Sequence, residues 1–210
     1  MGFEYEGLGG LDIFQLNINW NKPPIMSFYP FRKIQKFTAT AETIESVMNI
    51  IPMSFTIPVL IDTKEKEAAV IVFFDQMKGR LGRFWIKDPV SHIELYETIN
   101  ATDATFKIKN TGFADNFQAT ERIWLTSTDG TKDCVKWIQD VDASDPDFIE
   151  LTTVTPFVDT WTLNDHGFDM GLLRLVRFDT DELTINYSTD FTGVLDLKFK
   201  ELVYEYPEIL

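Results

Sequence analysis

The sequence is short of cysteine and histidine, and this shortage excludes several kinds of site. A single cysteine, Cys134, excludes an intrachain disulfide and a zinc site built from cysteines. Only two histidines, His92 and His166, are present, and no helix carries both on one face, so a zinc site of the HExxH type is excluded. We expect Cys134 to be a buried structural thiol rather than the partner of either histidine. Stability must therefore come from packing or from assembly.

Basic residues are also few. The chain has 19 lysines and arginines against 33 aspartates and glutamates, which gives a formal net charge of −14. A polyanion such as DNA is repelled by a field of this sign unless a basic patch interrupts it. The strongest basic cluster in the sequence, formed by Arg32, Lys33 and Lys36, is small and typical of a solvated strand face. We therefore predict no direct contact with nucleic acid.

Long apolar runs are absent as well. The longest strongly apolar run, Ala68 to Phe74, is far shorter than the roughly 20 residues that a membrane-spanning helix needs. Residues 1–10 are acidic and glycine-rich and have neither the basic nor the apolar region of a secretory signal. We expect a protein without a membrane span that is made in a cytoplasm, with residues 1–10 as a flexible arm.

Motifs that would carry catalysis or bind a cofactor are missing. The sequence contains no G-x-S-x-G elbow, no P-loop and no dinucleotide-binding turn between a strand and a helix, so we predict no enzyme and no cofactor. The run from Asp140 to Asp147 begins with the D-x-D-x-S spacing of a calcium loop. Its sixth position is Asp145 instead of glycine and its twelfth is Leu151 instead of glutamate. We predict a solvated acidic loop without a metal, with a loose calcium site as the alternative.

Aromatic residues, by contrast, are abundant. The 18 phenylalanines and five tryptophans suit the pleated, half-buried faces of sheets. Alternation of apolar and polar residues predicts strands at 14–20, 31–37, 84–86, 105–109, 122–127, 132–140, 148–153, 172–178, 182–187 and 194–203. Asp129-Gly130 predicts a hairpin turn between two of these strands. In the last strand, apolar residues at 195, 197 and 199 alternate with Asp196, Lys198 and Lys200.

One segment, residues 63–78, predicts an α-helix. Asp62 is expected to cap its N-terminus, with Glu65 three residues later completing a capping box. Lys78 suits the negative end of the helix dipole, and Gly79 is the expected left-handed stop. Apolar residues recur every three to four positions, which predicts one broad apolar face packed on a sheet. These residues are Ala69, Val70, Val72, Phe73, Phe74 and Met77.

The predicted elements divide the chain into two kinds of sequence. Residues 94–159 contain only short strands joined by polar turns, which predicts an inserted small β module. Residues 1–93 together with 160–210 predict a β-rich core domain that contains helix 63–78. The predicted fold class is therefore mainly β, a β-rich α+β fold: a β-sheet or sandwich core with one packing helix and an inserted, small barrel-like module.

Three stretches of the sequence resemble a known family. The helix segment leads into Phe73-Phe74, then Gly79-Arg80 and Phe84-Trp85; a middle section of short strands follows; and the C-terminal part carries the segments 175–183 and 199–202. Together these stretches resemble the tail-tip and baseplate structural proteins of tailed bacteriophages, in the distal-tail or hub-adaptor class. The acidic middle module departs from the family pattern, which leaves its partner open.

The resemblance implies a non-enzymatic structural subunit of the virion tail, assembled in the host cytoplasm. Such a subunit forms a homo-oligomeric ring that connects the tail tube to hub or fibre proteins. The resemblance gives a structural role to its motif residues and implies no catalytic residue, metal or cofactor. These motif residues are Phe73, Phe74, Gly79, Arg80, Phe84 and Trp85.

Two alternatives stay open from the residues alone. A carbohydrate- or receptor-binding β module of a tail fibre needs exposed aromatic rings, and Trp124, Trp137 and Trp161 are the candidates, although Trp137 alternates with apolar neighbours. A hydrolase of unrecognised type needs carboxylates that face each other across a cleft, and no spacing in the sequence selects such a pair.

Overall fold

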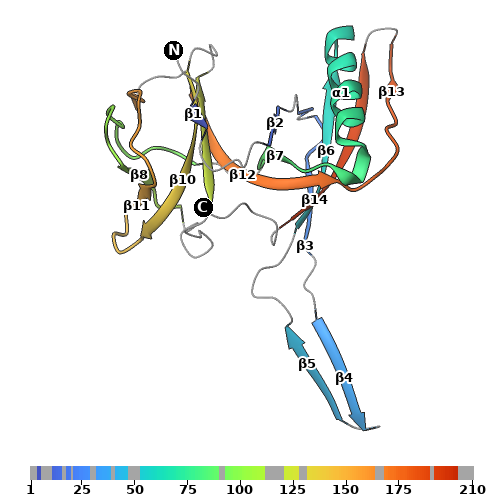
Figure 1. The fold of residues 1–210 in the computed structure, drawn as a ribbon, viewed down its shortest axis with the longest axis horizontal. Helices are drawn as coiled ribbons and strands as arrows, with labels where there is room; N and C mark the ends of the chain where they lie inside the picture. Colours follow the sequence, from blue (N-terminus) through green and yellow to red (C-terminus); the bar gives the residue numbers. More distant parts are fainter. Residues whose placement is uncertain are drawn as a thin grey trace. The chain divides into compact units, whose positions relative to one another are not determined.

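The protein is mainly β with a single α-helix in the part of the chain that the structure describes. A computed structural model describes residues 4–5, 11–15, 18–19, 21–28, 32–38, 41–46, 53–89, 93–111, 121–127, 132–163, 168–189 and 192–202, with backbone alone at 4–5, 32–38, 41–46 and 168. Strands dominate this part, and the helix α1 (Lys64–Met77) packs on them (Figure 1). The predicted fold class, a β-rich fold with one packing helix, is confirmed.

The chain divides into two compact units, which we describe separately. Unit 1 contains the described residues of 1–13 and 87–174, and unit 2 contains those of 14–86 and 175–206. The long segment 87–174 therefore interrupts unit 2 in the sequence. The segment predicted as an inserted module, 94–159, lies inside it.

Unit 2 is built on an antiparallel sheet with the strand order β3, β6, β14, β12. These strands are β3 (Ile25–Phe28), β6 (Met53–Ile61), β14 (Gly193–Glu201) and the last residues of β12 (Phe168–Phe178). Further pairs are formed by β7 (Phe84–Lys87) with β12 and with β2 (Ile13–Phe14), and by β13 (Asn186–Tyr187) with β14. β4 (Arg32–Thr38) and β5 (Ala41–Ser46) form a separate antiparallel pair.

The core of unit 2 follows from alternation in two long strands. In β14 the residues Leu195, Leu197 and Phe199 are buried, and in the antiparallel register Leu197 lies opposite Ile57 and Phe199 opposite Phe55. Residues directly opposite in a sheet share a face, so both strands direct their apolar side chains to one side. Rings from other elements complete the core: Phe14, Phe73, Phe74, Phe84 and Phe178 pack against one another at centroid distances of 4.3–6.3 Å.

The helix differs from its prediction at both ends and on one side. Thr63, not Asp62, is the N-cap: its hydroxyl accepts a hydrogen bond from the Lys66 N–H at 3.2 Å. The residue in the third helical position is therefore Lys66, and the predicted capping box with Glu65 does not form. Asp62 instead makes an ion pair with the Lys66 side chain at 2.7 Å, one turn along the helix.

At the C-terminal end the left-handed conformation begins at Lys78 (φ 49°) and continues at Gly79 (φ 59°), one residue earlier than predicted. The apolar face is also narrower than predicted. Val70 is buried, and Phe73, Phe74 and Met77 are partly buried against the core. Ala69 and Val72 were expected on this face but are exposed, Val72 by 55%.

Unit 1 is a small β module. Its antiparallel strands follow the order β12, β9 (Arg122–Ser127), β10 (Asp133–Asp142), β11 (Phe148–Thr153) and β8 (Thr105–Lys109). One apolar core runs beneath them and includes Ile123, Leu125, Cys134, Ile138, Ile149, Leu151, Met170 and Leu172. Cys134 is buried and forms no disulfide within the described residues, as predicted.

Some predicted elements are shorter than expected or cannot be compared. Within the predicted strand 14–20, Phe14 ends β2 and Ile18 forms an isolated bridge with Val59, and residues 16, 17 and 20 lie outside the described residues. Strand 182–187 is reduced to β13, because the Thr180 hydroxyl bonds both the N–H and the carbonyl of Glu182 and so forms a turn there. Within the expected arm 1–10, β1 (Glu4–Tyr5) pairs in parallel with β10. The predicted turn at Asp129-Gly130, His92 and His166 lie outside the described residues.

Candidate interaction surfaces

The residues that carry the family resemblance lie inside unit 2. Phe84 and Trp85 are fully buried, and Phe73 packs its ring edge-on to Phe84 at 5.0 Å. Gly79 is buried, whereas Arg80 is exposed. These residues build the interior and one turn of the unit.

The Gly79-Arg80 pair docks against a second turn of the same unit. The Arg80 N–H donates to Asp181 Oδ1 at 3.1 Å, and the Arg80 guanidinium lies 3.7 Å from Asp181 Oδ2. A Cβ on residue 79 would lie 2.7 Å from Asp181 Oδ1 and 3.2 Å from Asp181 Cα. Glycine is therefore required at this position both by its positive φ and by the close approach of the turn.

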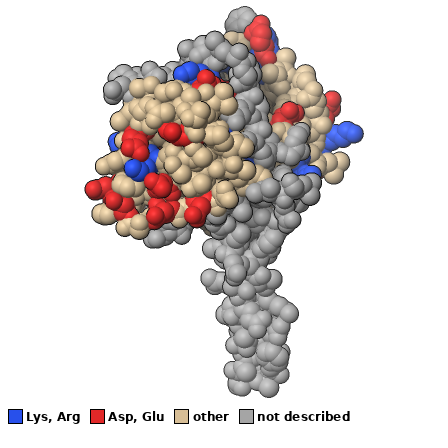
Figure 2. Space-filling model, turned by 60° about the vertical axis from the view of Figure 1, so that its left-hand side comes forward, with Lys and Arg blue, Asp and Glu red and all other residues tan. Residues whose placement is uncertain are grey.

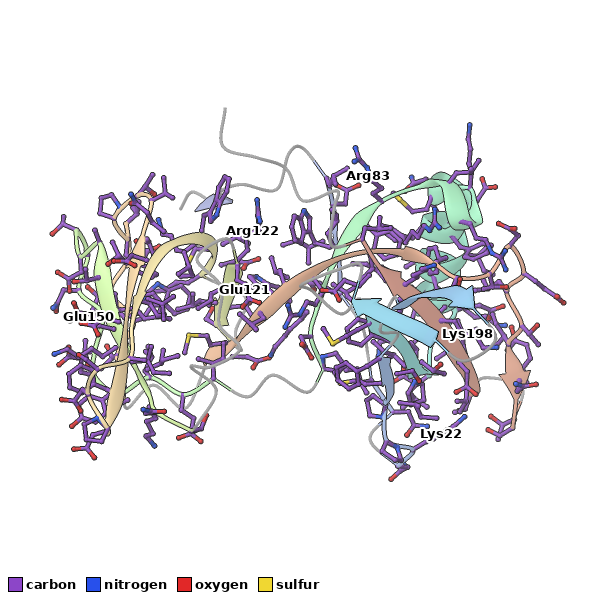
Figure 3. The ribbon with its side chains drawn as sticks, turned by 90° about the horizontal axis from the view of Figure 1, so that it is seen from below. Lys22, Arg83, Glu121, Arg122, Glu150 and Lys198 are labelled. Atoms are coloured by element: carbon purple, nitrogen blue, oxygen red, sulfur yellow. The ribbon has the colours of Figure 1, made fainter. Side chains whose placement is uncertain are left out.

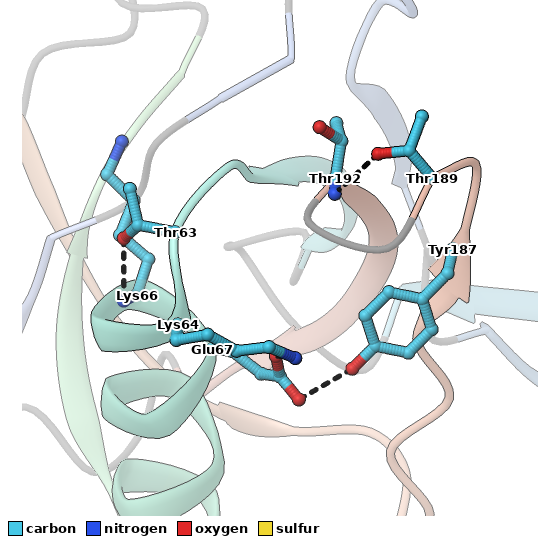
Figure 4. A network of polar contacts seen from close by, with 7 residues as sticks. All are labelled: Thr63, Lys64, Lys66, Glu67, Tyr187, Thr189 and Thr192. Carbon is cyan, nitrogen blue, oxygen red and sulfur yellow. Dashed lines mark hydrogen bonds and ion pairs between the residues drawn. The ribbon is translucent and has the colours of Figure 1, made fainter.

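A polar network joins the first turn of α1 to β13. The Tyr187 hydroxyl donates to Glu67 Oε1 at 2.6 Å, and Lys64 Nζ makes an ion pair with Glu67 Oε2 at 2.7 Å (Figure 4). The Lys64 hydrogen bond, followed by that of Tyr187, lowers the pKa of Glu67. The hydrogen bond to Glu67 raises the pKa of both Lys64 and Tyr187. The network is exposed and links two elements of unit 2; we call it the clasp.

Unit 1 contains a buried charge cluster. Arg174 donates from Nε to Asp88 Oδ2 at 3.2 Å and from Nη1 to Glu121 Oε1 at 3.0 Å, and both carboxylate residues are buried. Arg122, labelled in Figure 3, is fully buried. Its guanidinium lies 4.3 Å from the centre of the Trp137 ring. Buried charges that are paired in this way fix the local structure.

The tryptophans proposed as sugar-binding platforms are buried. The exposed fractions of Trp124, Trp137 and Trp161 are 6%, 8% and 3%. The Trp124 indole N–H donates to Asp133, and the Arg122 guanidinium covers the Trp137 ring. These rings therefore present no free face for a sugar to stack on. The burial of Trp137 agrees with its alternation with apolar neighbours in the sequence, and Trp124 and Trp161 are buried as well.

The acidic segment predicted as a loop forms the turn between β10 and β11. We call Asp140, Asp142, Asp145 and Asp147 the acidic turn. Asp142 Oδ1 accepts from the Ser144 N–H at 2.9 Å, and Asp145 Oδ1 accepts from the Asp147 N–H at 2.8 Å. In these hydrogen bonds the carboxylates hold the backbone of the turn in its conformation. Nowhere in the described part of the chain do three or more His, Cys, Asp or Glu side chains gather to hold a metal.

No cation neutralises the acidic turn within the described residues. The lysines of the neighbouring strands are paired elsewhere: Lys107 with Glu97 at 3.2 Å, and Lys109 with Glu94. Acidic side chains lie close together on the face of unit 1 that Figure 2 presents. The turn is therefore a concentrated negative surface.

The opposite charge gathers on the outer face of the sheet of unit 2. Arg177 lies directly opposite Lys200, and Lys198 is two residues before Lys200 on β14, so all three share this face. We call Arg177, Lys198 and Lys200 the basic row. The alternation of residues 195–200 in the sequence predicted a common face for the two lysines. Only the pairing of β12 with β14 adds Arg177.

Strand β3 presents the third surface. It pairs with β6 and has no second partner strand among the described residues. Phe28 is 60% exposed and Ile25 is 54% exposed. In the register Phe28 lies opposite Met53, which packs on the core of unit 2, so Phe28 extends the apolar side of the sheet beyond its edge.

Comparison of the sequence with protein-family models and with curated proteins finds no match. No helix in the described part of the chain is long and apolar enough to cross a membrane. The three surfaces are therefore the basis on which a function can be argued.

Proposed function

We propose that the protein is a non-enzymatic structural subunit of a phage tail tip or baseplate, which forms a ring connecting the tail tube to hub or fibre proteins. Its place would be the tail of the virion, after assembly in the host cytoplasm. Support comes from the sequence resemblance and from the β-rich fold. The observation that carries the proposal is the apolar edge strand β3.

An edge strand with exposed apolar residues is a template for another chain. The unpaired N–H and C=O groups of such a strand hydrogen-bond readily to a strand of a neighbour, and proteins that stay monomeric protect such edges with charges, prolines or bulges. The sequence of β3, Ile25-Met26-Ser27-Phe28, contains no charge and no proline. A strand added beside β3 would cover Phe28 and continue the core face of the sheet.

The alternative of a carbohydrate-binding module gains no observation in its favour. Its three candidate rings are buried, as described above. Saturable binding of the full chain on a glycan array would revive it.

Self-association tests the proposal directly. We expect the full chain to form a closed oligomer in native mass spectrometry and sedimentation velocity, and we expect Phe28→Glu to shift it to the monomer. Leu81→Glu is the matched control, because Leu81 is 79% exposed and lies in the same unit outside the edge strand. It should leave the oligomer unchanged.

Two results would contradict the proposal. One is a chain that stays monomeric at every concentration, alone and with tail-tube protein. The other is a cryo-EM map of the particle that encodes the protein in which no tail-tip ring contains it.

A further inference from the structure

We infer that neighbouring subunits of the ring meet head to tail, with the basic row of unit 2 of one copy against the acidic turn of unit 1 of the next. This inference rests on the proposed function, because it specifies how copies of the chain recognise one another. Its evidence is separate, since it concerns neither β3 nor the family motif.

No ion pair within the described residues involves the basic row, although Asp196, two residues before Lys198 on β14, places a carboxylate on the same face. Arg177, Lys198 and Lys200 make no ion pair, whereas Lys22 is paired with Asp196 on the same strand. Asp179 follows β12 and donates its backbone N–H to the Lys198 carbonyl, but its carboxylate makes no ion pair with the row.

The arrangement of the row is unfavourable in an isolated subunit. Arg177 and Lys200 are directly opposite one another on antiparallel strands. Like charges in this position repel each other and destabilise the sheet. An acidic partner would remove this repulsion; Lys198 is exposed, and Arg177 and Lys200 are partly exposed.

The acidic turn has the matching properties. Its four carboxylates lie between residues 140 and 147, at the end of β10 and in the turn that follows it, and hydrogen bonds from the Ser144 backbone and side chain lower the pKa of Asp142. The lysines on β8 are held by Glu94 and Glu97 and are not available to it. A second copy of this chain supplies the cations that the turn lacks.

We infer a heterologous contact, in which the basic row of one copy meets the acidic turn of the next, while the acidic turn of the first copy stays available to a further subunit. Contacts of this kind join copies head to tail and close into a ring when the rotation between copies is suitable. Exposed ion pairs contribute little affinity individually but set the register and speed of association. The charge contact would therefore orient subunits, while the β3 edge supplies apolar contact area.

Charge reversal tests this contact, with one matched control on each side. We expect Lys198→Glu and Asp147→Lys each to raise the dissociation constant of the oligomer roughly tenfold at low salt. Lys78→Glu and Asp159→Lys make the same charge changes at exposed positions outside the two surfaces and should have no effect. The doubly substituted chain Lys198→Glu/Asp147→Lys should regain wild-type association, because each interface again joins opposite charges.

The outcomes separate this inference from the proposed function. If the wild type forms rings that Phe28→Glu disrupts, but neither charge reversal weakens them, the head-to-tail contact is refuted and the ring stands. Equal weakening by the control substitutions, or no rescue in the double variant, also refutes it. A wild type that never associates refutes both.

Discussion

Replacing Gly79 by alanine adds a single methyl group and should destabilise unit 2 strongly. The left-handed conformation costs an L-residue about 1–2 kcal/mol. The added Cβ would also lie 2.7 Å from Asp181 Oδ1 and 3.2 Å from Asp181 Cα, so the turn must move away. Losing the hydrogen bond from the Arg80 N–H costs about 1 kcal/mol more. We expect the free energy of unfolding to fall by about 2–3 kcal/mol.

The adjacent residue provides a control of opposite sign. Lys78 has a φ of 49° although it is not a glycine. Lys78→Gly relieves the left-handed strain of about 1–2 kcal/mol and adds back about 0.5–1 kcal/mol of glycine entropy. This variant should therefore be as stable as the wild type or more stable, by up to about 1 kcal/mol.

Urea unfolding measures both variants. Tryptophan fluorescence and far-UV circular dichroism give the midpoint and slope, and hydrogen exchange at the amides of β6 and β14 localises the change to unit 2. An unfolding free energy for Gly79→Ala within about 0.5 kcal/mol of the wild type, the range of ordinary surface substitutions, would refute the reasoning. So would a Lys78→Gly variant that is less stable than Gly79→Ala.

Three further predictions follow from other contacts. Thr63→Ala should lower the free energy of unfolding by about 1 kcal/mol in urea titrations, and Asp62→Asn should lower it by less than half of that, because Thr63 is the cap. A larger loss for Asp62→Asn than for Thr63→Ala would contradict this assignment. In thermal unfolding across pH, the clasp should stabilise the protein between two limits. At acid pH its contribution is lost when Glu67 is protonated, and the pKa of Glu67 lies below its ordinary 4.5. At alkaline pH it is lost when Tyr187 ionises, and the pKa of Tyr187 lies above its ordinary 10.0. Tyr187→Phe should flatten the alkaline limb, and an unchanged limb would count against the clasp. Arg174→Met should lower the free energy of unfolding by about 3–5 kcal/mol in urea titrations, since it removes the guanidinium that two buried carboxylates bind. A loss below about 1 kcal/mol would show that the carboxylates do not depend on the guanidinium.

The sequence allowed the elements of the fold to be predicted better than their partners. Apolar alternation identified β14 and its buried residues, and the 3.6-residue period identified α1. The choice of Thr63 over Asp62 as the cap was not predictable, because both residues are good caps. Which of them caps the helix depends on the residue at which the backbone changes from extended to helical. The exposure of Val72 likewise depends on the width of the sheet, because a narrower sheet covers less of the helix surface.

The candidate surfaces were predictable only in part. The acidic turn is continuous in the sequence and was recognised as a solvated loop. The basic row needs the register of β12 against β14, which brings Arg177 beside Lys200. No local pattern contains that pairing. The same limit applies to the burial of the tryptophans, because the periodicity of one strand does not show whether other segments cover a ring.

The pairing of β6 with β14 also bears on how the chain is made. Gly193 on β14 pairs with Ile61 on β6, so β6 is synthesised well before the strand that pairs with it on that side. During translation the apolar row of β6 has no partner strand on that side, whereas the strands of unit 1 between residues 105 and 153 emerge together and pair locally. Nascent chains that stop before residue 193 should therefore aggregate or bind chaperones, and chains that include β14 should escape this.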